Sequence, residues 1–378
     1  MTQTVLLGDI ADINSESVGK NYPFNSIMYL DTSSVTENTF SELQPFDIVD
    51  APSRAKRIVK NGDIVYSTVR PNLKHFGYIN NPLENTVAST GFAVIRSRKD
   101  VDSKYLYYWL ASDERTEYLT AIADSQTSTF PAFNPSVLGK LKIELPDLAT
   151  QKKIADILGA IDEKIELNRR MNETLEQMGQ ALFRHHFIDN PEAEKWEEGT
   201  LGDLFEIIMG QSPPGSSYNE NGEGVTFYQG RAEFGVRFPN KRLSTIDPKR
   251  LAKRGDVLLS VRAPVGDINQ ATEDCCIGRG LASISSNNEQ ASFCYYTCRN
   301  LQSKLTEYNS EGTVFGAING KQLKSLAVRM PPKTVILEFE KQAQELDEQI
   351  LSNAQQIQTL TTLRDTLLPR LISGEVEV

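Results

Sequence analysis

An internal repeat constrains this chain more than any other feature of its sequence. Short motifs from the first half return in the same order in the second half, and the matching pairs are Leu7–Ile10 with Leu201–Leu204, Gly62–Ser67 with Gly255–Ser260, and Phe130–Asn134 with Phe315–Asn319. The number of residues that separates the last pair then stays the same, without a gap, as far as Asp162 and Asp347. Because the offset changes only where loops could differ, the sequence predicts two copies of one folding unit.

Each copy ends in a long segment that is free of proline, from about Ala149 to Phe187 and from about Thr334 to Leu368. Alternate steps of four and three residues place mostly apolar side chains on one stripe, which predicts a heptad seam in equal register in both copies. The seam residues are Ile154, Leu158, Ile161, Ile165, Asn168, Leu175 and Leu182 in the first copy, and Phe339, Leu346, Ile350, Asn353, Ile357, Leu360 and Leu367 in the second.

Neither stripe can be buried by one helix alone, so we expect the two helices to pack antiparallel about a pseudo-two-fold axis. The fold class is then α+β, with two duplicated domains joined by an antiparallel coiled coil in a circular arrangement. The predicted ranges are 1–146 and 196–332 for the domains, and 147–195 and 333–378 for the long helices. We expect the C-terminus near Trp196–Leu201 and the N-terminus near Phe187. A generic dimerisation arm is the alternative use of such helices.

Asn168 and Asn353 occupy matching seam positions, where a polar residue commonly fixes the register of a coiled coil. The alternative is that both side chains are solvated near a helix crossing.

Charge and composition limit the class of protein without excluding nucleic acid. The chain of 378 residues carries 40 basic and 50 acidic groups, but much of the excess acid lies in the two long segments, so a basic face on either domain is compatible with the total. No apolar run reaches the ~20 residues of a membrane helix, and no secretory signal is recognisable at the start. The four cysteines, all between Cys275 and Cys298, fit reduced thiols of a cytoplasmic protein, with a metal site as the alternative.

The motifs of catalysis are missing. The three histidines do not form a metal-binding pattern, Gly316–Lys321 does not fit a phosphate-binding loop, and neither an adenine-methyltransferase Pro-Pro motif nor a nucleophile elbow with triad partners is present. The sequence is therefore typical of a binding protein. The alternatives are an orphan DNA methyltransferase or nuclease of unusual type, and a coiled-coil scaffold that binds only protein.

Both domains carry clusters of basic and amide side chains, the types that contact phosphates and base edges. In the first domain the candidate DNA-binding residues are Arg54, Lys56, Arg57, Lys60, Arg70, Asn72 and Lys74. In the second they are Gln211, Ser212, Tyr228, Gln229, Arg231, Arg237, Lys241, Arg242, Arg262 and Arg279. For any single residue a solvated surface position is the simpler reading, but the recurrence of the cluster in both halves favours DNA for the groups.

These motifs, taken together, resemble the DNA-specificity subunit of type I restriction–modification enzymes. The resemblance covers nearly the whole chain and rests on Leu7–Ile10, Gly62–Ser67, Leu145–Ile154, Met209–Gly215, Gly255–Pro264, Gly278–Leu281 and Thr362–Gly374. One departure is Pro331–Ile336, which lacks the Gln-Lys-Lys-Ile stretch of the first copy. We expect partner contacts to differ in detail there.

The resemblance implies two target-recognition domains, each reading one half of an asymmetric bipartite site in double-stranded DNA. It further implies that the two helices act as a spacer and seat two methyltransferase subunits, which bind S-adenosylmethionine and methylate adenine. Restriction subunits, where present, would add translocation and cleavage driven by ATP and Mg, in defence against phage. This chain itself would hold no cofactor or metal and would have no catalytic residue.

Overall fold

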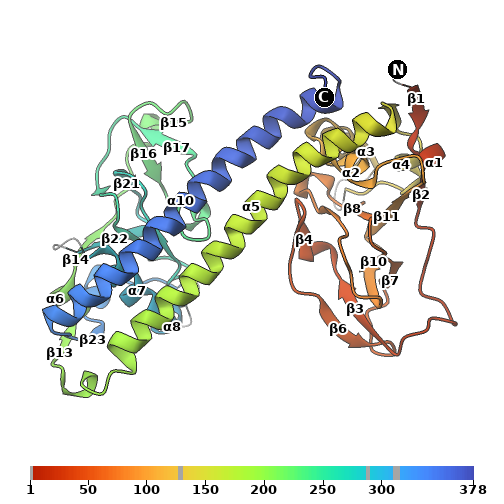
Figure 1. The fold of residues 1–378 in the computed structure, drawn as a ribbon. Coiled ribbons are helices and arrows are strands. Elements are labelled where there is room, and N and C mark those ends of the chain that lie inside the picture. The colour runs from red at the N-terminus through yellow and green to blue at the C-terminus, as the bar shows by residue number, and fades with distance from the viewer. Residues whose placement is uncertain (1–2, 127–130, 287–289, 310–315) are drawn as a thin grey trace. The chain divides into compact units, whose positions relative to one another are not determined.

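The computed structural model describes residues 3–126, 131–286, 290–309 and 316–378. These form two compact units (Figure 1). Unit 1 comprises Met1–Leu167 with Gln356–Val378, and unit 2 comprises Asn168–Gln355. Each unit therefore combines one domain with a part of each long helix. Within the described residues, no helix is long and apolar enough to cross a membrane.

Two four-stranded sheets form the domain of unit 1. The strand order in the first sheet is β6 (Gln44–Asp47), β3 (Ser26–Leu30), β10 (Thr86–Ser89) and β7 (Ala55–Ile58). The strand order in the second sheet is β2 (Ala11–Ile13), β11 (Phe92–Ser97), β8 (Ile64–Ser67) and β9 (Phe76–Tyr78). Two small pairs are β1 (Gln3–Leu6) with β12 (Lys142–Leu145) and β4 (Val35–Thr36) with β5 (Thr39–Phe40). The helices of the domain are α1 (Leu7–Ile10), α2 (Ser103–Ala111), α3 (Asp113–Gln126) and α4 (Ser136–Gly139).

Unit 2 repeats the two sheets of this plan, with five strands in place of four in one of them. The strand order in its first sheet is β15 (Tyr218–Asn219), β17 (Leu243–Thr245), β16 (Val225–Tyr228), β21 (Cys275–Ile277) and β18 (Leu251–Ala252). The strand order in its second sheet is β14 (Glu206–Met209), β22 (Leu281–Ser285), β19 (Val257–Ser260) and β20 (Ile268–Gln270). The small pair is β13 (Glu198–Thr200) with β23 (Ala327–Arg329), and the helices are α6 (Leu201–Leu204), α7 (Ala291–Asn300), α8 (Gln302–Glu307) and α9 (Gly320–Lys324).

Strand pairing confirms the predicted duplication. In unit 1, β10 pairs with β3 in parallel and with β7 antiparallel, and in unit 2, β21 pairs in the same way with β16 and β18. The matched motifs occupy equivalent places, since Val69 bridges to Ala132 and Arg262 bridges to Ala317. Phe130 and Phe315, which open that motif, lie outside the described residues. The glycine-rich Gly316–Lys321 segment is a helix start, because the side chain of Asn319 accepts hydrogen bonds from two backbone N–H groups of α9.

The long helices are α5 (Leu148–Phe183), continued by a π turn at Arg184–Ile188, and α10 (Lys333–Ile372). They run antiparallel in each unit. In unit 1, Arg364 Nη1 lies 3.0 Å from Asp162 Oδ1. In unit 2, Asn353 Nδ2 lies 2.9 Å from Asn172 Oδ1. Every predicted seam residue is buried or half-buried, and the α+β fold class is confirmed.

Each domain core continues into the long helices. In unit 1, one apolar cluster joins Tyr66 of β8 and Leu106 of α2 to Leu158 of α5. In unit 2, Phe183 of α5 packs with Phe293 of α7 and Phe339 of α10. The first helix begins close to the predicted boundary at residue 147 and the second begins at Lys333, while the compact units divide each helix near its middle. The four predicted sequence ranges remain predictions.

The ends of the chain correct one expectation. The C-terminal segment belongs to unit 1, where Lys153 Nζ donates to the Val378 carbonyl at 3.2 Å and Val376 packs against the core of that unit. Thr4 and Ser373 line the same cavity. The expected position of the C-terminus near Trp196–Leu201 is therefore wrong, because antiparallel pairing places the end of α10 beside the start of α5. The expectation for the N-terminus near Phe187 falls on residues 1–2, which lie outside the described residues.

The asparagines of the seam are buried, so the solvated alternative is wrong. Asn168 and Asn353 have 0% and 2% of their surface exposed. Asn353 donates to Asn172 across the helix pair and accepts from Gln349 Nε2 at 2.8 Å. Asn172 Nδ2 in turn donates to the Ile350 carbonyl at 3.2 Å. Hydrogen bonds between facing seam positions favour one register over its neighbours.

Replacing Asn353 by alanine is expected to destabilise unit 2 by about 1–3 kcal/mol, because the Asn172 amide oxygen loses the donor that Asn353 supplies inside the seam. Changing Asn172 and Asn353 together to leucine is expected to cost less than the sum of the two single changes, since neither amide is left without the other. Urea denaturation of the four chains gives the coupling between the two positions. Additive single effects would show that the amides do not act as a pair.

Candidate nucleic-acid interface

A glycine turn gathers several of the predicted DNA-binding residues of unit 2. The turn Gly278–Arg279–Gly280 joins β21 to β22, and the Gly278 N–H donates to the Tyr228 carbonyl at 2.8 Å. The Gln211 N–H donates to the Ile277 carbonyl at 3.0 Å. A Cβ atom on Gly278 would lie 2.8 Å from the Gln229 carbonyl oxygen. Only glycine therefore lets these backbones approach so closely.

We call Gln211, Ser212, Gln229, Arg262 and Arg279 the turn surface of unit 2. The Arg279 N–H donates to Ser212 Oγ at 3.2 Å. The Val261 N–H donates to the Gly280 carbonyl at 3.0 Å, which places Arg262 beside the turn. Four of the five residues are exposed and Ser212 is half-buried. Two guanidinium groups among amides and a hydroxyl match the groups that read guanine and adenine edges.

The equivalent turn of unit 1 lies at Thr90–Gly91, between β10 and β11. The Thr90 N–H donates to the Arg54 carbonyl at 2.7 Å, and the Thr68 N–H donates to the Gly91 carbonyl at 2.9 Å. A Cβ atom on Gly91 would lie 3.0 Å from Arg54 Nη2, so this guanidinium covers the turn. Two residues after Thr68, the Arg70 N–H donates to the Pro131 carbonyl at 2.8 Å. We call Arg54, Arg70 and Thr90 the turn surface of unit 1.

Four other predicted DNA-binding residues of unit 1 are not part of its turn surface. Asn72 is exposed next to Arg70, and Lys56 is exposed on β7. Arg57 Nη1 donates to Ser17 Oγ at 3.4 Å, and Lys60 pairs with Glu16 at 2.5 Å. Exposed pairs of this kind contribute ~0–1 kcal/mol and can exchange partners at small cost.

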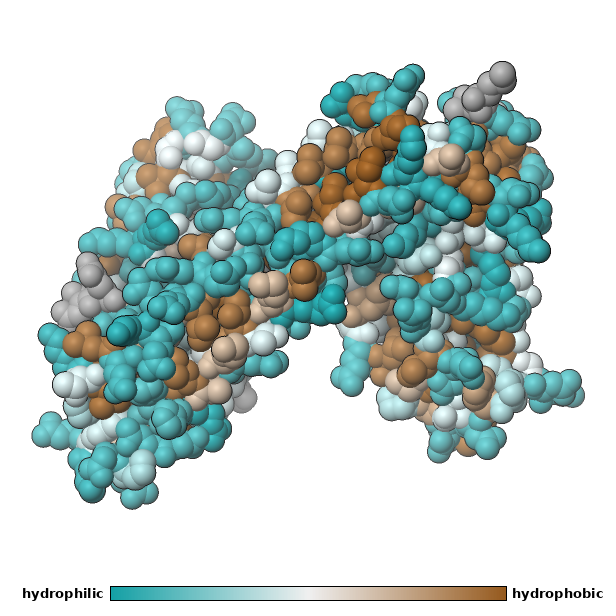
Figure 2. Space-filling view, viewed as in Figure 1, coloured by the Kyte–Doolittle hydropathy of each residue, from teal (hydrophilic) through white to brown (hydrophobic). Residues whose placement is uncertain are grey.

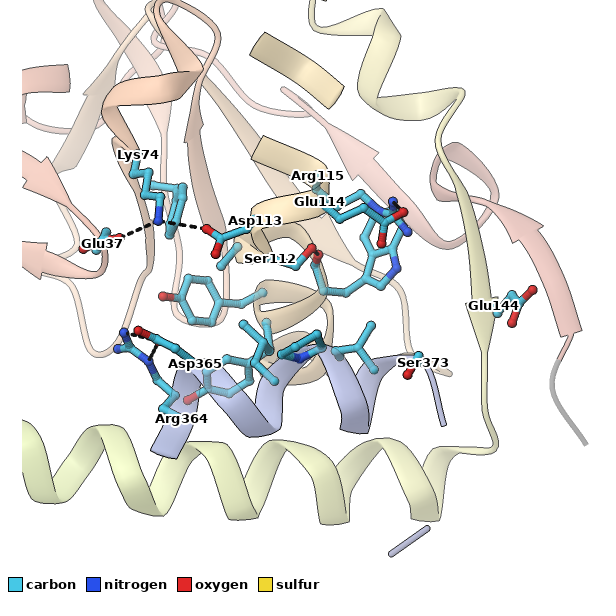
Figure 3. Close-up of a pocket in the computed structure, with 18 of the residues that line it drawn as sticks. Glu37, Lys74, Ser112, Asp113, Glu114, Arg115, Glu144, Arg364, Asp365 and Ser373 are labelled. Carbon is cyan, nitrogen blue, oxygen red and sulfur yellow. Dashed lines mark hydrogen bonds and ion pairs between the residues drawn. The ribbon is translucent and has the colours of Figure 1, made fainter. Parts of the chain in front are cut away.

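Lys74 does not join the turn surface. Its Nζ lies 2.9 Å from Asp113 and 3.1 Å from Glu37, on the wall of a cavity that Arg364 and Asp365 of α10 also line (Figure 3). The hydrogen bond to Asp113 is the largest cause that raises the pKa of Lys74. Two acid partners reduce its attraction for a phosphate, so Lys74 is the weakest of the predicted contacts in this domain.

Three predicted cations of unit 2 are exposed but paired with acids. Arg231 pairs with Asp267, Lys241 Nζ lies 2.6 Å from Glu273, and Arg242 Nη2 lies 2.8 Å from Glu233. Burial raises the pKa of Glu273, but the hydrogen bonds from Lys241 and Thr226 outweigh it, so the net pKa lies below its ordinary value.

Two predicted DNA-binding residues are corrected. Tyr228 is fully buried, because its ring packs in the apolar cluster of β21 and β22. Arg237 has 4% of its side chain exposed and lies between Glu176 of α5 and Asp347 of α10. Neither side chain is presented on the surface. Tyr228 follows the buried Phe227, and Arg237 is flanked by the apolar Val236 and Phe238.

Thr90 was missed by the sequence analysis, although a signal for it exists. Gly91 precedes β11 as Gly280 precedes β22, so Thr90 stands where Arg279 stands. Comparing the glycines that precede matching strands would have found the position.

The cysteines lie outside both turn surfaces. All four are free and buried, and burial raises the pKa of Cys275 to about 12. This thiol is therefore protonated at neutral pH. Among the described residues, no group of three or more His, Cys, Asp or Glu side chains could hold a metal ion.

Comparison with known proteins identifies the family. The family described as the type I restriction modification DNA specificity domain matches twice, over residues 2–177 and 193–367. The chain is 33% identical to the putative type I restriction enzyme MjaX specificity subunit of Methanocaldococcus jannaschii, over 98% of this chain and 90% of that protein. It is 28% identical to the HindI specificity subunit of Haemophilus influenzae, with 98% of each chain covered.

A solved structure shares the fold. The S subunit of a type I restriction–modification system from M. genitalium has a TM-score of 0.63 at 17% identity, and the alignment covers 98% of this chain and 96% of that one. The two family matches span both repeats, and their order agrees with the duplication seen in strand pairing. The chain therefore belongs to the family of type I restriction–modification DNA specificity subunits, which recognise DNA and are not themselves catalytic.

Proposed function

We propose that each domain of this chain reads one half of an asymmetric bipartite site in double-stranded DNA through its turn surface. The observation that carries the proposal is the recurrence of one construction in both domains. In each, a glycine turn between two central strands brings an exposed arginine together with segments that are distant in the sequence. Because the side chains at equivalent points differ, with Thr90 in one unit and Arg279 in the other, the two half-sites differ in base sequence.

The long helices, in this proposal, seat two methyltransferase subunits and set the distance between the half-sites. Each helix pair exposes large apolar side chains, and apolar patches on the face in view lie among hydrophilic residues (Figure 2). The exposed apolar residues are Leu148, Ile157, Leu167 and Leu363 in unit 1, and Met171, Met178, Ile188 and Leu337 in unit 2. Apolar side chains that recur on an exposed helix face are typical of a protein-binding surface.

The chemistry belongs to the partners. The methyltransferase subunits bind S-adenosylmethionine and methylate adenine in each half-site, and restriction subunits, where they assemble, use ATP and Mg. This chain contributes recognition and spacing. The complex acts on DNA in the cytoplasm.

Mapping of methylated adenines across the genome of the host, with and without this chain, tests the proposal directly. The expected result is a single bipartite motif with two specified halves, a fixed spacer, and complete loss of methylation when the chain is removed. Methylation that persists without the chain would contradict the proposal. So would a chain that binds no duplex even with its partners present, which is what the scaffold alternative predicts.

Arg279→Ala is expected to relax the base sequence of the second half-site and to leave the first half-site unchanged. A bidentate contact between arginine and guanine contributes about 1–3 kcal/mol of discrimination, so methylation at sites altered by one base is expected to rise by about fivefold or more. Methylome mapping measures the change.

The matched control is Lys195→Ala, which removes a positive charge from an exposed side chain that pairs with Glu192, away from the turn surface. It is expected to leave both half-sites as they are. A motif unchanged by Arg279→Ala would remove this residue from the base-reading surface.

A further inference from the structure

Arg237 joins the second domain to both long helices within unit 2. Its Nη1 lies 2.7 Å from Glu176 Oε2 on α5, and its Nη2 lies 2.7 Å from Asp347 Oδ1 on α10. The guanidinium carbon lies 3.9 Å from the centre of the Tyr295 ring on α7. The Arg237 carbonyl accepts the Gln270 N–H at 2.8 Å, which fixes this residue to β20. One side chain of the domain therefore contacts three helices.

Unit 1 contains the same acid, but no arginine of its domain pairs with that acid among the residues that the structure describes. Asp162 of α5 is the repeat equivalent of Asp347, and Tyr108 of α2 donates to it at 2.7 Å, as Tyr296 of α7 donates to Asp347 at 3.1 Å. The arginine that faces Asp162 is Arg364, which lies on α10 and also pairs with Asp365 of the same helix (Figure 3). In unit 1 the negative charge of Asp162 is thus balanced by an arginine of the other long helix, whereas in unit 2 the negative charge of Asp347 is balanced by an arginine of the domain.

Gly179 explains why the two units differ. It occupies on α5 the repeat position that Arg364 occupies on α10. A Cβ atom on Gly179 would lie 2.0 Å from the Tyr296 hydroxyl oxygen and 2.4 Å from the ring carbon that bears it. The ring of Tyr296 thus fills the space where a side chain at position 179 would begin, so the position that matches Arg364 cannot carry an arginine.

We propose that Arg237 is a positioning residue, which fixes the orientation of the second domain on the helix pair and thereby sets how strictly the complex measures the distance between its half-sites. The inference rests on the proposed function. It assigns to this domain a buried arginine that pairs with both long helices, whereas among the described residues of unit 1 the arginine facing Asp162 lies on α10.

The two ion pairs of Arg237 oppose rotation of the second domain on the helix pair. Two carboxylates on different helices accept from one planar guanidinium, so a rotation of the domain stretches at least one of two short contacts. Burial lowers the pKa of Arg237, but its interactions with Asp347, with Tyr295 and Tyr296 and with Glu176 together outweigh burial, so the net pKa is raised and the arginine stays charged. Removing one partner of a buried ion pair leaves the other charge uncompensated, so the domain loses its preferred orientation.

The test is methylome mapping in the host with Arg237→Met in the full chain and its native partners. A spacer changed by one base pair moves a half-site by about 3.4 Å along the DNA and turns it by about 35°. The wild-type complex is expected to reject such sites. Arg237→Met is expected to methylate them at about tenfold higher frequency, with both half-site sequences retained. Relaxed base sequence with an unchanged spacer would overturn the inference.

Arg364→Met is the matched control, because it removes the equivalent guanidinium from unit 1, where the contacts made by that group lie on the helices. It is expected to lower the thermal unfolding midpoint and to keep the wild-type spacer. If it relaxes the spacer as much as Arg237→Met, loosening of the helix pair is the cause and the inference fails.

Glu176→Gln keeps the volume of the side chain and removes one of the two charge contacts. It decides the outcome if Arg237→Met does not fold. A relaxed spacer with Glu176→Gln supports the inference that Arg237 positions the domain, and a strict spacer in a folded Glu176→Gln chain overturns that inference. A wild-type complex that methylates no bipartite motif would instead contradict the proposed function, so the two failures are distinguishable.

Discussion

Gly179→Ala is expected to lower the stability of unit 2 by about 3 kcal/mol, at the upper end of the cost of overpacking a core. The added Cβ would lie 2.0 Å from the Tyr296 hydroxyl oxygen, closer than any real contact. Tyr296 cannot move away freely, because its ring is 1% exposed and packs at 5.9 Å from Phe339. Its displacement would also break the hydrogen bond to Asp347.

The control lies on the same helix. Gly159 of α5 has room for a methyl group, since its Cβ would lie 3.7 Å from Lys104 Nζ and 3.9 Å from the Tyr108 hydroxyl oxygen. Gly159→Ala is expected to stabilise unit 1 by about 0.5–1 kcal/mol through the helix propensity of alanine. Urea unfolding midpoints of the two variants should therefore move in opposite directions. A midpoint for Gly179→Ala at or above that of the wild type would show that the close approach of Tyr296 does not constrain the helix.

Insertion of four residues after Asn168 and four after Asn353 is expected to keep both half-sites and to lengthen the DNA spacer by one or two base pairs. Each helix grows by about 6 Å and turns by about 400°, so the heptad stripe returns to within about 40° of its original facing. Six ångströms correspond to a little under two base pairs at about 3.4 Å each. Both insertion points lie close to where the two compact units divide the helices.

The paired design matters because Asn168 and Asn353 are repeat equivalents on antiparallel helices. One insertion alone shifts the seam of a single helix and separates Asn353 from Asn172, with which it shares a hydrogen bond at 2.9 Å. The single insertion after Asn168 is therefore expected to lose methylation. Methylome mapping of the double insertion measures the spacer. An unchanged spacer in an active double insertion would show that the helices do not set the distance.

The sequence by itself determined the architecture. Collinear repeats predicted two copies of one unit, and spacing by four and three residues predicted the seam from Ile154 to Leu182 and from Phe339 to Leu367. These features could be read because they are periodic. A heptad stripe exposes apolar surface that must be covered whatever the surrounding loops do. The buried asparagines followed from the same pattern, although the partner of Asn353 is Asn172 rather than a residue fixed by symmetry.

Only the tertiary structure decided which polar residues face solvent and which face each other. Arg237 and Arg279 look alike in the sequence, yet one is buried between two helices and the other is exposed on a glycine turn. The position of the C-terminus beside Lys153 likewise follows from antiparallel helix pairing and not from the order of the repeats. The physical reason is that a charged side chain carries no periodic signal. Its environment is set by contacts such as those of Arg237 with Glu176 and Asp347, which lie far away along the chain and come together only when the unit has folded.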